Sequence, residues 1–311
     1  MLALRDIDPP TCGDRDVIVR VHAAGCGPDV WHVMTGLPYF ARLGLGLRRP
    51  KLRVRGLDVA GVVETVGSAV EGVSLGDEVF GVADGSFAEL AVARAAKVAP
   101  KPTSLDFTEA AALPISGLTA LQALRDVAAV QAGQRVLVIG AGGGVGTCAV
   151  QIAKSMGAHV TAVCSTGKRD LVRSIGADDV IDYTREDFTD GQTRWDVIVD
   201  TAGRRALRAL RRALTAKGTL VVVGGDGGGR WTGGFFRGML GGPLLSPFVG
   251  QKLRSLISKE KREDLIALAE LVERGELAPV IDRTFPLRAA ADAIRYLAQG
   301  HPAGKVVVTV V

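Results

Sequence analysis

The sequence lacks the features that mark membrane-spanning or exported proteins. Only 5% of its 311 residues are aromatic. No stretch approaches the roughly 20 consecutive apolar residues that a transmembrane helix needs, and no charged and then apolar leader opens the chain. These absences predict a soluble, unexported protein without a membrane partner.

Cysteine and histidine are also scarce, with four of each. No CxxC pair occurs, which argues against a disulfide framework or a structural zinc lobe and favours the reducing cytoplasm. The four cysteines are Cys12, Cys26, Cys148 and Cys164.

Acidic residues are slightly fewer than basic ones, and the net charge is +5. A basic balance can indicate nucleic acid, but this excess is spread through arginines along expected helices. The densest run is "RRPKLRVR", Arg48–Arg55. We expect it to form a solvated loop or a surface facing a phosphorylated cofactor, and nucleic acid is the less favoured partner.

Glycine and short apolar runs are abundant, and they predict an α/β protein of two domains. From Asp16 to Ala99, short strand-like segments with Gly and Asp at the turns predict a small, partly closed β-domain. Helical texture begins at Leu105, with Thr108 expected to cap "EAAALP" and Pro114 to interrupt the helix.

From Arg135 onward, strand and helix patterns alternate, which predicts a doubly wound parallel sheet. A glycine-rich and aromatic segment after Gly224 is expected to be a loop that covers a ligand. The last part predicts a helix from Lys261 to Arg274, a strand pair around "VIDRTFPL", a helix over residues 289–299 and a final strand "KVVVTVV".

The segment "RVLVIGAGGGVGTCAVQIAK" places a strand, a glycine-dense turn and a helix in direct succession. In this order the first helical N–H groups and the helix dipole point at whatever anion binds the turn. The motif reads Ala141-x-Gly143-x-x-Gly146, with alanine in place of the first glycine of the dinucleotide fingerprint. It predicts a dinucleotide site, although a tight turn in an α/β core is the alternative.

The expected second strand ends at Cys164-Ser165-Thr166-Gly167-Lys168-Arg169, without the acid that usually binds the ribose of NAD. A hydroxyl from Ser165 and the cations of Lys168 and Arg169 suit a 2′-phosphate instead. The sequence therefore predicts NADP(H) as cofactor.

Several spaced motifs resemble the medium-chain dehydrogenase/reductase superfamily, in its zinc-free quinone oxidoreductase (zeta-crystallin-like) branch. They include "GLDVAGVVETVGSAVEGVSLGDEVFG", "AAALPISGLTALQAL", "GAGGGVG", "GADDVIDYTREDF", "DVIVDTAG" and "GHPAGKVVVTV". The resemblance implies a GroES-like catalytic domain from residues 1–104 and 278–311, and a Rossmann NADP(H)-binding domain from residues 105–277. Such relatives usually begin further upstream, so either an earlier start was missed or one edge strand is absent.

The resemblance also implies a set of cofactor contacts. It puts Tyr183 and Lys168 beside the adenosine 2′-phosphate. The other residues that it places along the dinucleotide are Thr119, Gly143, Gly144, Val145, Gly146, Thr201, Gly203 and Gly224.

Zinc-dependent members of the superfamily hold their metal with the cysteine of "CGxD" and the histidine of "GHE". Cys26-Gly27-Pro28-Asp29 resembles the first motif, but the second is replaced by Gly56-Leu57-Asp58, and leucine cannot bind zinc. Aligned on Pro28, Gly27 takes the place of an asparagine found in quinone reductases, and Cys26 becomes a small buried hydrophobe. We expect no catalytic metal.

Without a metal, the acceptor must stabilise charge by its own conjugation, which favours a quinone or an α,β-unsaturated carbonyl. His32 falls where related reductases often carry a tyrosine, and with Tyr39 it is the candidate to hydrogen-bond the acceptor oxygen. The expected pocket lies between the domains, lined by Trp31, Tyr39 and Phe40 with Trp231 or Phe235.

Two alternatives remain open. An enoyl-thioester reductase of the same superfamily would use the basic run near Arg48 to hold a CoA or carrier phosphate. A weakly catalytic NADPH- and RNA-binding protein would show salt-sensitive binding to RNA. The family likeness also suggests a homodimer.

Overall fold

The computed structural model describes residues 2–37, 39, 42, 53–224, 241–242, 245–246, 249–300 and 302–310. The chain divides into two compact units. Unit 1 comprises Met1–Gly36, Arg42–Leu118 and Lys259–Val311, and unit 2 comprises Leu37–Ala41 and Thr119–Ser258. The expected domain borders after residues 104 and 277 stay a prediction; the division by contacts assigns residues 105–118 and 259–277 to unit 1.

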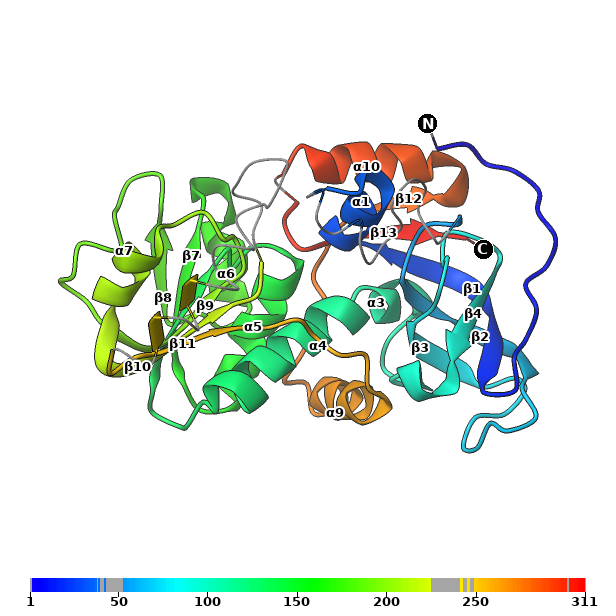
Figure 1. Cartoon of the computed structure of the whole chain (residues 1–311), viewed down its shortest axis with the longest axis horizontal. Coiled ribbons are helices and arrows are strands. Elements are labelled where there is room, and N and C mark those ends of the chain that lie inside the picture. The colour runs from blue at the N-terminus through cyan, green and yellow to red at the C-terminus, as the bar shows by residue number, and fades with distance from the viewer. Residues whose placement is uncertain are drawn as a thin grey trace. The chain divides into compact units, whose positions relative to one another are not determined.

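Unit 1 is built around a seven-stranded sheet in which both ends of the chain meet. The first strand, β1, pairs antiparallel with the last strand, β13, and the blue and red arrows lie side by side in Figure 1. Val17, Val19 and Val21 alternate along β1 and are completely buried in the core of this unit. The strands are β1 (Asp16–Cys26), β2 (Asp58–Val66), β3 (Glu78–Val82), β4 (Leu90–Arg94), β5 (Val98–Pro100), β12 (Ile281–Pro286) and β13 (Lys305–Thr309).

The helices of unit 1 follow the expected pattern with one correction. The N-cap of α3 is Asp106, whose carboxylate accepts the N–H of Glu109 while Glu109 bonds back to the N–H of Asp106. The prediction that Thr108 caps this helix is therefore wrong, because Thr108 already lies inside it. The helices are α1 (Pro28–Thr35), η2 (Ala95–Lys97), α3 (Phe107–Ala111), α9 (Arg262–Glu273), η6 (Leu287–Ala289) and α10 (Ala290–Ala298).

Pro114 begins a new helix, α4 (Pro114–Gln122), because its missing N–H is no loss in the first turn. The helix α4 continues into a π-helical segment, η3 (Ala123–Ala128). Near the carboxyl end of the chain, "VIDRTFPL" forms the single strand β12, parallel to β13, rather than the expected strand pair.

Unit 2 contains a six-stranded, all-parallel sheet in the order β11-β10-β9-β6-β7-β8. From the central β6, the chain builds β7 and β8 on one side and then β9, β10 and β11 on the other, so the strand order reverses between β6 and β9 (Figure 1). Ligands of open α/β sheets bind outside the carboxyl ends of the strands at such a reversal. The elements are β6 (Arg135–Ile139), α5 (Gly144–Ser155), β7 (His159–Cys164), η4 (Thr166–Lys168), α6 (Arg169–Ser174), β8 (Asp179–Asp182), β9 (Trp195–Asp200), α7 (Leu207–Arg212), β10 (Leu214–Val222) and β11 (Lys252–Ser255).

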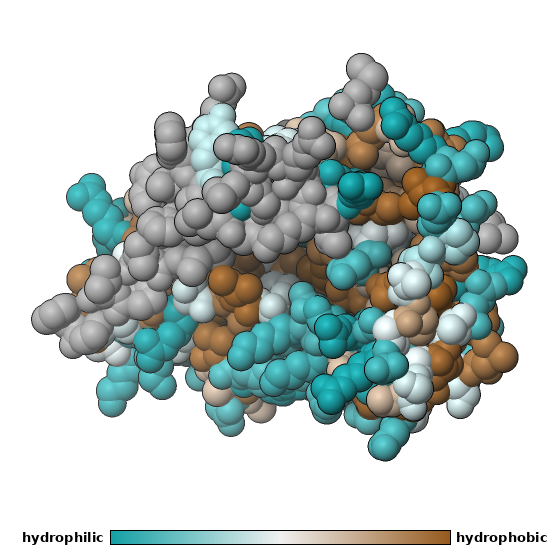
Figure 2. All heavy atoms as spheres, turned by 45° about the vertical axis from the view of Figure 1, so that its right-hand side comes forward, coloured by the Kyte–Doolittle hydropathy of each residue, from teal (hydrophilic) through white to brown (hydrophobic). Residues whose placement is uncertain are grey.

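The surface carries both hydrophilic and hydrophobic side chains (Figure 2), as expected from a sequence with 23% charged and 47% hydrophobic residues. On the face shown in Figure 2, hydrophilic and hydrophobic side chains alternate in small groups. Among the described residues, no helix has the length and apolar character needed to cross a bilayer. All four cysteines are free thiols.

Candidate functional site

The glycine turn after β6 ends at the amino terminus of α5. Gly143 is the N-cap of this twelve-residue helix and has extended backbone angles, and no side chain caps it. The N–H groups of the first turn, from Gly144 to Gly146, therefore have no side-chain acceptor at the cap. A helix end of this kind attracts an anionic group.

Two glycines make this turn sterically possible. A Cβ at Gly146 would overlap the carbonyl oxygen of Gly140, so only glycine lets α5 approach the turn so closely. Gly140 itself has φ +79°, and a Cβ there would lie 2.5 Å from the Thr201 hydroxyl. The alanine of the motif, Ala141, is completely buried behind the turn. The structure thus brings the predicted residues Gly143, Gly144, Val145 and Gly146 into one cradle.

Lys168 lies against this cradle from the end of the neighbouring strand, β7. Its ammonium group donates to the carbonyl of Gly142 at 3.3 Å, and a Cβ at Gly142 would lie 2.5 Å from the lysine Cδ. Ser165 precedes the short helix η4 that carries Lys168. On the next strand, Tyr183 follows β8 with its side chain 43% exposed, and its N–H donates to the carbonyl of Cys164. Ser165, Lys168 and Tyr183 therefore gather at the ends of two paired strands.

A carboxylate that the sequence did not point to, Asp182, lies at the end of β8, directly before Tyr183 and paired with Cys164 of β7. It is 1% exposed and accepts hydrogen bonds from the hydroxyls of Thr166 at 2.6 Å and Thr184 at 2.7 Å. These two hydroxyls lower the pKa of Asp182 to about 2. Because its oxygens are engaged in fixing the turn that carries Ser165, the carboxylate stabilises the turn. The Asp-x-Thr spacing, typical of an Asx turn, was the available signal.

The other side of the cradle comes from β9 and β10. Thr201 donates to the carbonyl of Ile139 at 2.8 Å, which ties the end of β9 to the glycine turn. The N–H of Gly203, at φ +63°, donates to Asp200, whose pKa is raised by burial. A Cβ at Gly224 would overlap the carbonyl of Thr201, so the chain after β10 passes close above it.

Of the expected cofactor contacts, Thr119 comes from a different part of unit 2. It lies in α4, is 7% exposed, and donates to the hydroxyl of Ser258 at 3.0 Å. The remaining predicted residues follow the ends of β6, β7, β8, β9 and β10, which are neighbours in the sheet. An uncapped helix end, glycines that clear the backbone and a cation on the turn fit a bound dinucleotide.

Unit 1 contains a buried ion pair that the sequence analysis also missed. Lys305 donates to Asp58 at 2.5 Å, and the two side chains are 6% and 1% exposed. Asp58 also accepts the N–H of Ile115 at 2.8 Å, and the lysine lies 3.4 Å from the hydroxyl of Ser116. Burial alone would lower the pKa of Lys305, but the carboxylates of Asp58 and Asp29 outweigh it and raise the pKa.

The chemistry of this cluster does not suit a metal. Burial raises the pKa of the Cys26 thiol to about 12, and Cys26 lies in the hydrophobic core of unit 1. Leu57, at the position of the expected histidine ligand, offers no donor atom. Within the described residues, no group of three or more His, Cys, Asp and Glu side chains is arranged to hold an ion.

The two catalytic candidates lie on separate segments. His32 is half-buried in α1 and packs edge-on against Trp31, with ring centroids 5.5 Å apart. On the same helix, burial raises the pKa of Asp29 to about 6, while Lys305 and His32 act in the opposite direction. Tyr39 is half-buried in a short turn. Phe40, Trp231, Phe235 and Arg48–Leu52 of the basic run lie outside the described residues.

Comparison with known proteins places both units in one family. The model of the alcohol dehydrogenase GroES-like domain matches residues 13–103, and a model described as zinc-binding dehydrogenase matches residues 175–308. The mouse mitochondrial NAD(P)H oxidoreductase RTN4IP1 is 35% identical in an alignment that covers 95% of this chain and 82% of the relative. The chain belongs to the medium-chain dehydrogenase/reductase superfamily.

Within this superfamily the chain resembles the zinc-free quinone oxidoreductases. A chloroplast envelope quinone oxidoreductase homolog of Arabidopsis thaliana is 32% identical, over 96% of this chain and 91% of the relative. The tomato (Solanum lycopersicum) 2-methylene-furan-3-one reductase is 34% identical, over 96% and 73%.

Solved structures of the superfamily have the same fold. The quinone oxidoreductase from Coxiella burnetii has a TM-score of 0.83 and 28% identity over 99% of this chain and 94% of that one. The CurK enoyl reductase has a TM-score of 0.84 and 25% identity over 98% and 94%. The resemblance stated from the motifs is confirmed, and the superfamily member described here is a nicotinamide-dependent oxidoreductase with a GroES-like and a Rossmann domain.

Proposed function

We propose that the protein is an NADPH-dependent, zinc-independent reductase that delivers hydride to a quinone or an α,β-unsaturated carbonyl. The observation that carries the proposal is Lys168 on the glycine turn, beside Ser165 and Tyr183. These groups supply a cation and two hydroxyls next to the place where the adenosine ribose of a bound dinucleotide lies in this fold.

The electrostatics of the strand ends favour a 2′-phosphate over a free ribose hydroxyl. Selectivity for NAD normally depends on a carboxylate that accepts hydrogen bonds from the ribose. Asp182 is close in sequence to Tyr183, but the hydroxyls of Thr166 and Thr184 already occupy its oxygens. A phosphate would gain charge-assisted hydrogen bonds from Lys168, which are stronger than neutral ones.

In this proposal, residues of the chain bind the cofactor, orient the acceptor and supply its proton. When bound, the nicotinamide supplies the hydride. The uncapped end of α5 and its glycines hold the pyrophosphate, and Thr201 keeps the turn in place against β9. His32 and Tyr39 are proposed to hydrogen-bond the acceptor oxygen as negative charge develops, with His32 as the candidate proton donor.

The acceptor is proposed to be activated by its own conjugation, because the cluster around Lys305 is unsuited to zinc. The tomato relative is named for an enone and the plant and bacterial relatives for quinones, which supports these two substrate classes. The likeness to the CurK enoyl reductase favours an enoyl thioester as second candidate. Turnover of NADPH with a quinone panel, an enone panel and an enoyl-thioester panel discriminates among them. Turnover with thioesters alone would contradict the first proposal.

Cofactor preference is tested by titration of nicotinamide fluorescence. We expect Lys168→Gln to weaken NADPH binding about tenfold, the value of one lost charge-assisted bond, and NADH binding by less than about twofold. Arg173→Gln is the matched control, because Arg173 lies on the following helix α6 and forms an ion pair with the exposed Asp170. Equal affinities of the wild type for NADPH and NADH would refute the assignment.

Three further expectations belong to the proposal. Metal analysis of protein purified without chelator is expected to find no stoichiometric zinc. A cytoplasmic location stays a prediction, since the relatives include proteins named mitochondrial and chloroplast envelope. The homodimer also stays a prediction, and light scattering of the purified chain tests it.

A further inference from the structure

A second group of cationic side chains lies at the amino ends of the strands of the unit 2 sheet. Arg194 immediately precedes β9, and Gln251 immediately precedes β11, so both lie at the amino ends of parallel strands. Arg208, Arg211 and Arg212 come from α7, the helix that leads into the amino end of β10. The proposed dinucleotide cradle lies at the carboxyl ends of the same strands.

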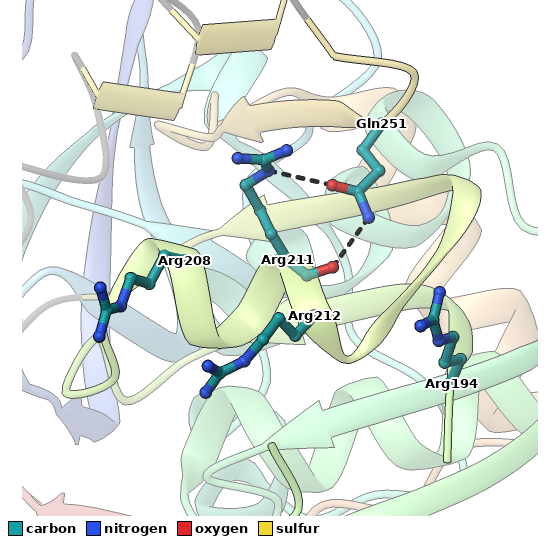
Figure 3. A pocket seen from close by; sticks show the side chains of 5 residues that line it. All are labelled: Arg194, Arg208, Arg211, Arg212 and Gln251. Atoms are coloured by element: carbon teal, nitrogen blue, oxygen red, sulfur yellow. Dashed lines mark hydrogen bonds between the residues drawn. The ribbon is translucent and has the colours of Figure 1, made fainter. Parts of the chain in front are cut away.

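The five side chains line a pocket of about 530 Å³ (Figure 3). Its volume is in the range of pockets that hold small ligands. Gln251 fixes one wall: its amide oxygen accepts from Arg211 Nε at 3.1 Å and its NH₂ donates to the Arg211 carbonyl at 2.8 Å. Arg208 and Arg212, one helical turn apart on α7, extend in the same direction.

None of the four arginines forms an ion pair among the residues that the structure describes, although Arg212 is near enough to Asp187 to help lower the pKa of that carboxyl and ion pairs are frequent elsewhere in unit 2. Lys154 pairs with Asp178, and Arg205, just before α7, pairs with Asp187. Four like charges around one hollow repel one another weakly through solvent, and a bound anion would offset this repulsion. The arrangement therefore favours the binding of a negatively charged ligand.

We infer that this pocket, lined by Arg194, Arg208, Arg211, Arg212 and Gln251, binds a compact ligand with several phosphate groups, such as a polyphosphate or a multiply phosphorylated polyol. Guanidinium groups bind phosphate oxygens in pairs and keep their charge at all relevant pH values. None of the described residues that line the pocket is aromatic, so among them a base could stack only on a guanidinium plane. This favours a ligand recognised by its phosphates over a nucleic acid.

The probe is inorganic tripolyphosphate, titrated calorimetrically into the full chain at about 0.15 M salt, where long-range attraction is screened. We expect the double variant Arg208→Gln/Arg212→Gln to bind at least about tenfold more weakly. The control Arg5→Gln/Arg288→Gln removes the same charge from exposed positions of unit 1 and is expected to stay within about twofold. Circular dichroism shows whether each variant is folded; Arg211 is left intact because it holds Gln251.

Four results would overturn the inference. The first is that the wild type does not bind tripolyphosphate up to about 1 mM, and the second is that the control variant Arg5→Gln/Arg288→Gln weakens binding as much as the pocket variant does. The third is that Lys168→Gln abolishes tripolyphosphate binding while the pocket variant binds it normally. The fourth is that a short single-stranded RNA binds more tightly than tripolyphosphate through the same arginines. Vesicles with and without phosphoinositide identify the source of the phosphates. Binding to the phosphoinositide vesicles that depends on Arg208 and Arg212 supports the same site with a lipid headgroup as ligand.

Discussion

Removing the positive charge of Lys305 is expected to destabilise unit 1 strongly. The Lys305→Met variant keeps most of the side-chain volume but deletes the ammonium group that lies 2.5 Å from Asp58. The carboxylate, 1% exposed, would keep the N–H of Ile115 but lose its counter-charge. Breaking a buried ion pair from one side typically costs about 3–5 kcal/mol, because an uncompensated charge is left in the interior.

We expect the losses of stability caused by Asp58→Asn and by Lys305→Met to be non-additive, because each substitution breaks the same ion pair. In the double variant Asp58→Asn/Lys305→Met, both charges are gone, so it should be more stable than the sum of the two single losses predicts, by up to about 3 kcal/mol. Lys154→Met serves as the matched control. Its pair with Asp178 has side chains 34% and 29% exposed, and partly exposed pairs are worth about 0–1 kcal/mol.

Urea denaturation followed by circular dichroism measures the total effect, and amide hydrogen exchange locates it. We expect the protection of β1 and β13 to fall in Lys305→Met, while that of β6 in unit 2 stays near the wild-type value. A loss below about 1 kcal/mol in the single variant would refute the reasoning, as would strictly additive losses in the double variant.

Three other changes test separate parts of the structure. Gly146→Ala should abolish dinucleotide binding, measured by fluorescence titration, because its Cβ overlaps the Gly140 carbonyl and pushes α5 from the turn; unchanged affinity would contradict this. Asp106→Ala should cost about 1 kcal/mol in urea denaturation through loss of the capping box, and a neutral result would contradict the cap. Because the pKa of Asp29 is raised to about 6, its contribution to stability is lost as pH rises from about 4 to 6. The stability of Asp29→Asn relative to the wild type should therefore increase as the pH rises over that interval. A difference in urea midpoint between the two proteins that stays constant with pH would contradict the raised pKa of Asp29.

Much of the fold follows from periodicity in the sequence. The helix predicted from Lys261 to Arg274 is found as α9, Arg262–Glu273, because its apolar residues recur at helical spacing. The buried strands of the parallel sheet are also apparent from continuous apolar runs such as "RVLVI". Local capping was harder to predict. Asp106 and Thr108 are both good N-caps, and only the hydrogen bonds of the folded chain distinguish them.

In the candidate site, too, local features could be predicted from the sequence and contacts between distant residues could not. The glycine turn was predictable because its residues are contiguous and each meets a local requirement of the strand-turn-helix unit. Lys305 and Asp58 are 247 positions apart, and their pairing follows from the sheet that joins the chain ends. A single sequence contains no signal for such a pair. Asp182 was missed for another reason: its neighbours in the chain show the Asx turn, but only the pairing of β7 with β8 brings Thr166 to it.

The pairing of β1 with β13 has a consequence for synthesis on the ribosome. All residues of unit 2, which ends at Ser258, are synthesised before β13, which comprises Lys305–Thr309. Until then, β1 lacks one hydrogen-bonded neighbour and presents open backbone groups from Ala23 to Cys26. The nascent chain therefore carries all residues of unit 2 while the sheet of unit 1 still lacks one strand, and β1 keeps unpaired backbone groups until β13 is made.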